Sequence, residues 1–157
     1  MSIDNKPNAG RIKLLYLLVP FVFTAFIAVT IFLETFDGYD FLFIVAIVFI
    51  LIIMFLHNIK FRYIIFDIKD NKIVLRYHGL GPIGTTFKSI EFPAQKLAKY
   101  EIQSAFFGIR KELVLYQETK KGIAKYPGVS LSAMASKDRE KLLAVLYNVL
   151  KLNGKKG

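Results

Sequence analysis

The stretch LLYLLVPFVFTAFIAVTIFL, from Leu14 to Leu33, decides how the rest of the sequence is interpreted. It has no charged side chain, and at about 1.5 Å per residue a helix of this length covers the roughly 30 Å hydrocarbon core of a bilayer. Pro20 lies near the end of the run, where a membrane helix tolerates it. The run is longer than the apolar core of a signal peptide, and no A-x-A-like cleavage site follows it. The sequence therefore predicts an uncleaved membrane span.

A second apolar run, FLFIVAIVFILIIMFL, extends from Phe41 to Leu56. It is slightly shorter than the about 20 residues that a span needs, so a span is expected over 41–59, with His57 and Asn58 at the membrane interface. The alternative is a buried core helix, which two neighbouring runs of this kind do not favour. The segment between the runs, Glu34–Asp40, has three acids and a glycine, as is typical of a tight turn.

Basic residues flank the two runs on one side only. Three precede the first run and four follow the second, namely Lys6, Arg11, Lys13, Lys60, Arg62, Lys69 and Lys72. Because Lys and Arg collect in short cytoplasmic flanks, both termini are expected in the cytoplasm. The predicted organisation is a cytoplasmic tail at 1–13, a transmembrane helical hairpin at 14–59, and a cytoplasmic domain at 60–157.

The chain carries a net charge of +10, distributed unevenly along its 157 residues. Residues 1–59 hold three basic and four acidic side chains, a net −1, which leaves +11 for residues 60–157. There is no cysteine, which excludes disulfides, thiolate zinc sites and cysteine nucleophiles. The only histidines are His57 and His78, which excludes an all-histidine metal cage.

Short runs with a period of two, typical of β-strands, begin at Phe61. In Lys72–His78 alternate residues are apolar, and an Asp-Asn turn precedes them, which predicts a hairpin. A change to helical periodicity follows, with apolar residues at Leu142, Leu143, Leu146, Val149 and Leu150. The expected strands cover 61–68, 72–78, 85–92, 98–106, 112–119 and 123–131, and an amphipathic helix is expected over about 137–152, with Ser136 as its N-cap.

The segment HGLGPIG contains Gly79-x-Gly81-x-x-Gly84, the spacing of a dinucleotide-binding turn. Such a turn requires a helix that begins at its last glycine, because the helix N-terminus holds the pyrophosphate. Here a strand-like run that ends at Pro93 follows the last glycine. The match is therefore interpreted as a coincidence, and the glycines as a bend between two strands.

The order of these elements resembles that of small membrane-anchored bacterial proteins with a pleckstrin-homology-like (PH-like) domain. The resemblance is carried by the two apolar runs, the strands beginning YIIFDIKDNKIVLRY, the segments IEFPAQKLAKYEI and FGIRKELVLYQETKKG, and the helix SLSAMASKDREKLLAVL. It implies a membrane-anchored α+β protein of the bacterial cytoplasmic (inner) membrane. In such a protein the transmembrane hairpin precedes a PH-like antiparallel β-barrel, which the C-terminal helix caps. It also implies a binding or scaffolding role without turnover.

No residue is selected as catalytic, metal-ligating or cofactor-binding, so the chain is expected not to be an enzyme. No serine stands in a nucleophile-elbow context, and no carboxylate pair is distinguished by its sequence position. The two histidines are interpreted as surface or interfacial residues, with His57 near the headgroups and His78 at a strand end. No nucleic-acid-binding signature accompanies the positive charge, so no nucleic acid is expected as a partner.

The basic residues of the domain are candidates for contact with the anionic cytoplasmic leaflet, where each contributes on the order of 1 kcal/mol. The alternative is a solvated surface without a specific ligand. The turn Lys69–Lys72, which matches the phosphoinositide-binding loop of eukaryotic PH domains, has two lysines separated by an aspartate and an asparagine, which disfavours specific headgroup recognition. The candidate membrane-surface residues are Lys60, Arg62, Arg110, Lys111, Lys120, Lys121 and Lys125.

Two functional hypotheses follow from the sequence. The first is a membrane-tethered interaction module that binds a protein partner or a second copy of itself, with Phe106 and Phe107 as a candidate partner groove. The second is a module that senses anionic lipids through its basic face. A small enzyme or a transport subunit is a third and less favoured alternative.

Overall fold

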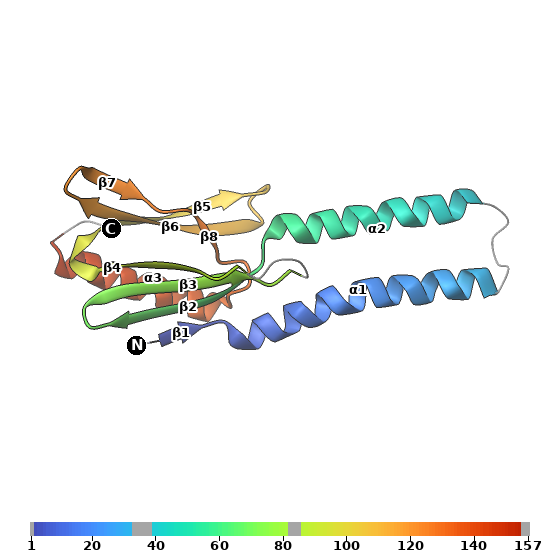
Figure 1. Cartoon of the computed structure of the whole chain (residues 1–157), viewed down its shortest axis with the longest axis horizontal. Coiled ribbons are helices and arrows are strands. Elements are labelled where there is room, and N and C mark those ends of the chain that lie inside the picture. The colour runs from blue at the N-terminus through green and yellow to red at the C-terminus, as the bar shows by residue number, and fades with distance from the viewer. Residues whose placement is uncertain (1, 33–38, 82–85, 155–157) are drawn as a thin grey trace.

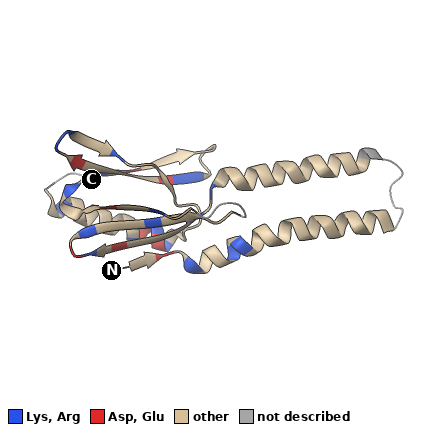
Figure 2. Cartoon of the chain, in the orientation of Figure 1, with Lys and Arg blue, Asp and Glu red and all other residues tan. Residues whose placement is uncertain are grey.

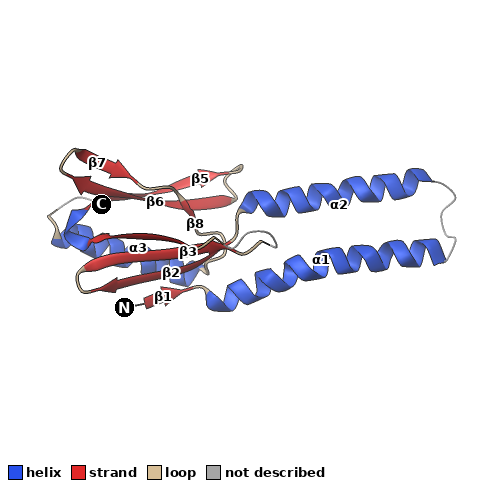
Figure 3. Ribbon diagram, viewed as in Figure 1, coloured by secondary structure: helices blue, strands red, loops and turns tan. Residues whose placement is uncertain are grey.

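Two long helices extend from one end of a β domain, and the chain returns to that domain after the second helix (Figures 1 and 3). The computed structural model describes residues 2–32, 39–81 and 86–154. Most of the turn expected over Glu34–Asp40 lies outside the described residues. Gly84, the last glycine of the glycine motif, also lies outside them. The end of the β domain that adjoins the helices is called the proximal end below, and the opposite end the distal end.

The helices α1 (Lys6–Phe32) and α2 (Tyr39–Ile59) are long and apolar enough to cross a membrane. They pack through the stacked rings of Phe23 and Phe49, whose centroids are 3.9 Å apart. In the most apolar 18-residue window of each, 0% and 11% of the residues are buried by the rest of the chain. A core helix of a soluble protein would be mostly buried, so this alternative does not describe them.

The first sheet is antiparallel and pairs β1 (Ser2–Asp4), β2 (Arg62–Lys69), β3 (Lys72–Gly79) and β4 (Lys88–Pro93) in that order. Asp70 and Asn71 form the β2–β3 turn, both with positive φ, as a tight hairpin turn requires. The strand after the glycine motif is β4, and the described residues beyond Gly81 include no helix before it. The strands on either side of the motif, β3 and β4, pair antiparallel, which is not the parallel βαβ arrangement of a dinucleotide-binding turn.

The second sheet centres on β6 (Arg110–Thr119), which pairs with β5 (Leu97–Ala105), β7 (Gly122–Lys125) and β8 (Val129–Ser130). The prediction of one strand over 123–131 was wrong, because the chain leaves β6 after β7 and returns to it at β8. Pro127, which has no N–H to donate to a strand partner, lies in the interruption.

The final helix, α3 (Ser136–Leu152), packs its apolar stripe against both sheets and forms a single core with them. Leu142, Leu146 and Leu150 are fully buried, in the same core cluster as Phe66 of the first sheet and Leu115 of the second. The N-cap is Ala135, not Ser136 as predicted, and no side chain caps this end. The α+β architecture, with N-terminal helices, antiparallel sheets and a last helix, is confirmed.

The predicted closed barrel is not formed. Within the described residues the structure has two four-stranded sheets, and no strand of one pairs with a strand of the other. Between β4 and β5 the chain passes through Pro93 and a 3-10 turn, η1 (Ala94–Lys96), which carries it from one sheet to the other without a shared ladder. The leucines of α3 pack into the core that both sheets share. A barrel would close this core by pairing strands of the two sheets, whereas here α3 covers it.

The expected N-terminal tail is largely structured. Ser2–Asp4 form β1, in which Ile3 is buried against the core, and α1 begins at Lys6 instead of Leu14. The Asp4 Oδ1 atom accepts a hydrogen bond of 3.0 Å from the Lys6 N–H, which satisfies one free donor of the first helical turn. The first helix therefore begins directly after a strand of the β domain.

We expect Leu146→Ala to lower the free energy of unfolding by about 2–5 kcal/mol, because it leaves a cavity between the two sheets. Urea titration of the full chain in detergent, followed by circular dichroism, measures this change. Tyr147→Ala is the matched control, since Tyr147 is 52% exposed on the same helix and its loss should cost much less. Equal losses for the two variants would show that α3 does not seal the core as described.

Candidate functional site at the junction of the helices and the β domain

Strand β2 is connected to both helices. The second helix runs into β2 through Lys60 and Phe61, and the first helix is held to β2 by the buried side chain of Asn5. Its amide Nδ2 donates to the Arg62 carbonyl at 2.9 Å, and its Oδ1 accepts from the Ile64 N–H at 2.8 Å. Asn5 thereby extends the β1–β2 ladder with its side chain, and both helices meet the domain at its proximal end.

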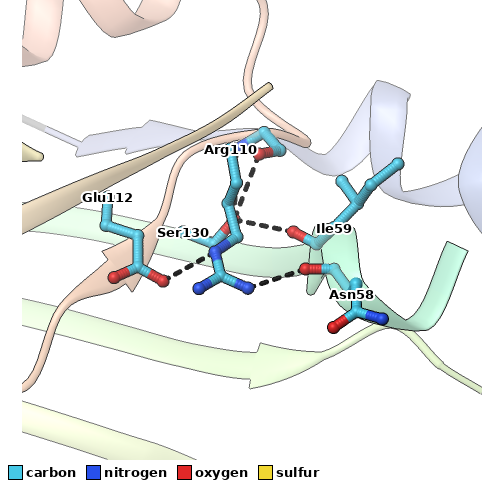
Figure 4. Close-up of polar contacts among 6 residues, drawn as sticks. Asn58, Ile59, Arg110, Glu112 and Ser130 are labelled. Carbon is cyan, nitrogen blue, oxygen red and sulfur yellow. Dashed lines mark hydrogen bonds and ion pairs between the residues drawn. The ribbon is translucent and has the colours of Figure 1, made fainter. Parts of the chain in front are cut away.

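A second set of polar contacts joins the C-terminus of α2 to β6 and β8 (Figure 4). Arg110 Nη1 donates to the Asn58 carbonyl at 2.7 Å, and Arg110 Nε lies 2.9 Å from a Glu112 carboxylate oxygen. The Ser130 hydroxyl donates to the Ile59 carbonyl at 3.3 Å. The last carbonyls of a helix have no partner within the helix and carry partial negative charge, so a guanidinium is well suited to this end.

A cavity of about 550 Å³ lies between α1, α2 and the proximal ends of β2, β3 and β4. Its apolar wall includes Pro20 of α1 and Ile53 of α2. Tyr16 and Phe61 also line it, with their rings in edge-to-face contact at 6.5 Å, and the Tyr16 hydroxyl donates to the Leu56 carbonyl at 3.1 Å. The cavity is therefore bordered by the two helices and by the domain at once.

The polar wall of this cavity is basic. Lys60, Arg62 and Lys88 line it, and none of its lining residues is acidic. The Arg62 guanidinium lies 4.9 Å from the centre of the Tyr77 ring, in a cation–π contact. Among the residues that the structure describes, no carboxylate lies within ion-pair distance of these three cations. The cavity is thus a site of uncompensated positive charge.

Both histidines of the chain line the same cavity, although they are 21 positions apart in the sequence. No sequence pattern predicts that His57 and His78 lie together. Burial, with a smaller contribution from the nearby Lys13, lowers the pKa of His78, which favours its neutral form. Within the described residues no group of three or more His, Asp or Glu side chains could hold a metal ion. The basic surroundings favour an anion at this cavity over a cation.

Lys and Arg residues occur at both ends of the domain (Figure 2), and the seven candidate membrane-surface residues are spread along its length. Lys60, Arg62, Arg110 and Lys111 lie at the proximal end. Lys120 and Lys121 follow β6 at the distal end, about 30 Å from Arg110 at roughly 3.3 Å per residue, and Lys125 pairs with Tyr116, about 20 Å from Arg110. These seven residues therefore do not lie together on the domain.

Phe106 and Phe107 lie in the β5–β6 turn at the proximal end of the domain. The Phe106 ring contacts the Phe55 ring of α2, with centroids 5.7 Å apart, whereas Phe107 is 96% exposed. Both have positive φ, which is rare for large side chains. The two residues lie in a turn beside α2, so this apolar surface is placed where the helix meets the domain.

A hydrogen-bonded cluster that the sequence analysis did not single out covers part of the outer face of the second sheet. Glu101 accepts hydrogen bonds from Lys99 Nζ at 2.6 Å, Tyr116 OH at 2.7 Å and Gln103 Nε2 at 3.1 Å. These donors lower the pKa of Glu101 from 4.5 to about 2, the contribution of Lys99 being the largest. The alternation of Lys99, Glu101 and Gln103 along one strand is the sequence signal for three of the four members. Tyr116 joins them only through the β5–β6 register.

Comparison of the chain with protein-family models, with curated proteins and with solved structures finds no match. The functional inferences below therefore rest on the residues of this chain.

We expect Asn5→Ala to lower the free energy of unfolding by about 1–3 kcal/mol, because it leaves the buried Ile64 N–H without its acceptor. Urea titration of the full chain measures the loss, and hydrogen exchange at the Ile64 amide should accelerate. Asn8→Ala, in the first turn of α1, is the matched control, since Asn8 makes no such contact with β2. Unchanged exchange at Ile64 in the Asn5 variant would contradict the assigned role.

We expect Lys99→Met to raise the pKa of Glu101 from about 2 toward 4.5, because it removes the strongest donor to the carboxylate. Carbon-detected NMR titration of the glutamate carboxyl groups measures this change, with Lys96→Met as the control that leaves the pKa in place. Since the folded-state pKa is depressed, the contribution of Glu101 to stability is present above pH 4.5 and is lost as the pH falls toward 2. A Glu101 titration midpoint that is the same in both variants would contradict the network.

Proposed function

We propose that this chain is a non-enzymatic, membrane-tethered interaction module that holds its distal basic end away from the bilayer for a protein partner with an acidic surface. In this proposal α1 and α2 cross the bacterial cytoplasmic membrane, and both termini are cytoplasmic. The exposed apolar surfaces of the two helices and the basic residues at their domain ends support this orientation. Two antiparallel sheets with a C-terminal helix between them support a PH-like domain.

The separation of the two basic groups is the observation that carries the proposal. Charges in solution are screened over about 8 Å at physiological ionic strength, whereas Lys120 and Lys121 lie about 30 Å from the proximal end. The anionic leaflet into which the helices insert cannot attract side chains at that distance. Because hydrogen bonds to both helices fix the domain at its proximal end, the distal lysines face the cytoplasm.

The surroundings of the histidines and of Glu101 support the proposal that the chain binds a partner without catalysing a reaction. The two histidines adjoin lysines and an arginine, with no carboxylate at their cavity to orient or activate them. Glu101, the carboxylate with the most depressed pKa, already accepts three hydrogen bonds and is held ionised. It is a poor general base for this reason, because its proton affinity at neutral pH is low.

The test uses single-cysteine cross-linking, which is clean because the chain has no native cysteine. We expect Lys121→Cys, labelled with a photo-activated cross-linker in native membranes, to form an adduct with a partner. Lys137→Cys, on α3, is the matched control and should not form it. Lys120→Glu added to the Lys121→Cys chain should abolish the adduct, because it reverses a charge without touching the core.

An adduct of twice the 18.0 kDa chain mass would identify the partner as a second copy of the protein. Equal adducts from Lys121→Cys and Lys137→Cys, or an adduct insensitive to Lys120→Glu, would contradict a docking surface at the distal end. Labelling of Lys121→Cys by an impermeant maleimide from outside intact cells would contradict the proposed orientation.

A further inference from the structure

We propose that the cavity at the junction of the helices and the β domain binds the phosphate headgroup of one acidic membrane phospholipid. Lys60, Arg62 and Lys88 are the ligands of the phosphate, and the apolar wall formed by α1 and α2 receives the adjoining part of the lipid. This inference rests on the proposed membrane insertion of the helices, but not on the distal docking surface.

The charges at the cavity favour an anion. Three cations come from three different elements, the end of α2, β2 and β4, and converge on one space of about 550 Å³ without an acidic lining residue. Such a volume is within the range of small-molecule sites. Since like charges repel each other, a cluster of this kind is stabilised when an anion occupies it. Arg62 is additionally held by its contact with Tyr77, which orients a planar group suited to phosphate.

Lys60 occupies a position where glycine would be the ordinary residue. It follows the last residue of α2 with a φ of 51°, in the left-handed region, and its N–H donates to the His57 carbonyl at 3.2 Å. Helices commonly end with glycine at this point, because a side chain is unfavourable there. This lysine directly follows the C-terminus of α2, and its side chain lines the cavity. A lysine in this left-handed conformation is less stable than a glycine would be. A turn with only a structural role would not need the lysine, so the side chain has a reason to be there beyond the turn.

The position of the cavity favours a lipid over a soluble phosphate compound. Pro20 and Ile53 belong to the apolar part of the helices and line the same space as the three cations. The cavity therefore combines cations that suit a charged headgroup with apolar side chains that suit hydrocarbon. The β2–β3 turn at Lys69–Lys72, by contrast, lies at the distal end of the domain, about 25 Å along β2 from Arg62 at roughly 3.3 Å per residue. The proposed lipid site is separate from that turn.

The experiment is native mass spectrometry of the full-length protein in a mild detergent, titrated with phosphatidylglycerol. We expect one lipid to bind each chain at concentrations where phosphatidylcholine does not bind. Lys60→Gly and Lys88→Gln should each weaken this binding about tenfold, as expected for loss of one charged contact. Lys60→Gly should leave the thermal midpoint unchanged or raise it, because glycine adopts the required backbone conformation without strain. Lost lipid binding in this variant can then not be ascribed to unfolding.

The paired variants Lys120→Gln and Lys121→Gln are the distal controls and should bind the lipid as the native chain does. Equal weakening by proximal and distal variants would show general charge attraction and would overturn the proposal. Displacement of the lipid by inorganic phosphate at equal concentration would assign the cavity to a soluble anion instead and would also overturn it. Extraction of the native chain from membranes by alkaline carbonate would count against membrane insertion itself, which separates that failure from a failure of lipid binding.

Discussion

The pairing of the N-terminus with β2 is the constraint on which the rest of the structure depends. Asn5 makes two hydrogen bonds to the β2 backbone, and β1 continues the same ladder with Ile3 in the core. The first helix also reaches the domain through a small apolar cluster of Ala9, Leu80 and Ala133, and the pairing adds backbone hydrogen bonds to this contact. With the pairing, β2 is connected to both helices at one end, which fixes the direction of the domain relative to the hairpin.

This attachment gives the β domain two chemically different ends. The proximal end combines the basic cavity, the Arg110 contact with the end of α2 and the exposed Phe107, which together form a mixed apolar and cationic surface typical of a membrane interface. The distal end has exposed lysines in its turns, and the described parts of α1 and α2 lie away from it (Figure 2). Lys120 and Lys121 are about 30 Å from the proximal basic residues, so electrostatic screening makes the two sets act independently.

Features with a local periodicity were predicted well from the sequence. The apolar helices, most strand positions and the leucine stripe of α3 follow from patterns within about 20 residues. Features that depend on distant partners were not found. The three residues of β1 are too few to show a period, and their partner strand begins about 60 positions later. The two-sheet arrangement was missed because strand periodicity does not specify which strands pair across the molecule. The cavity was missed because His57, His78 and Lys88 meet only through the junction, although Lys60 and Arg62 had been singled out for their charge.

The order of pairing in the first sheet has a consequence for biogenesis. Ser2 pairs with Asp67, so β1 is synthesised before both helices and waits for a partner strand that is synthesised only after them. With the helices in a membrane, β1 and β2 can meet only when the chain has crossed twice and returned to its starting side. A nascent chain with one helix left uninserted, or inserted in the opposite sense, would leave Ile3 and the β2 edge exposed. For helices placed in a membrane, completion of this sheet requires that β1 and β2 reach the same side.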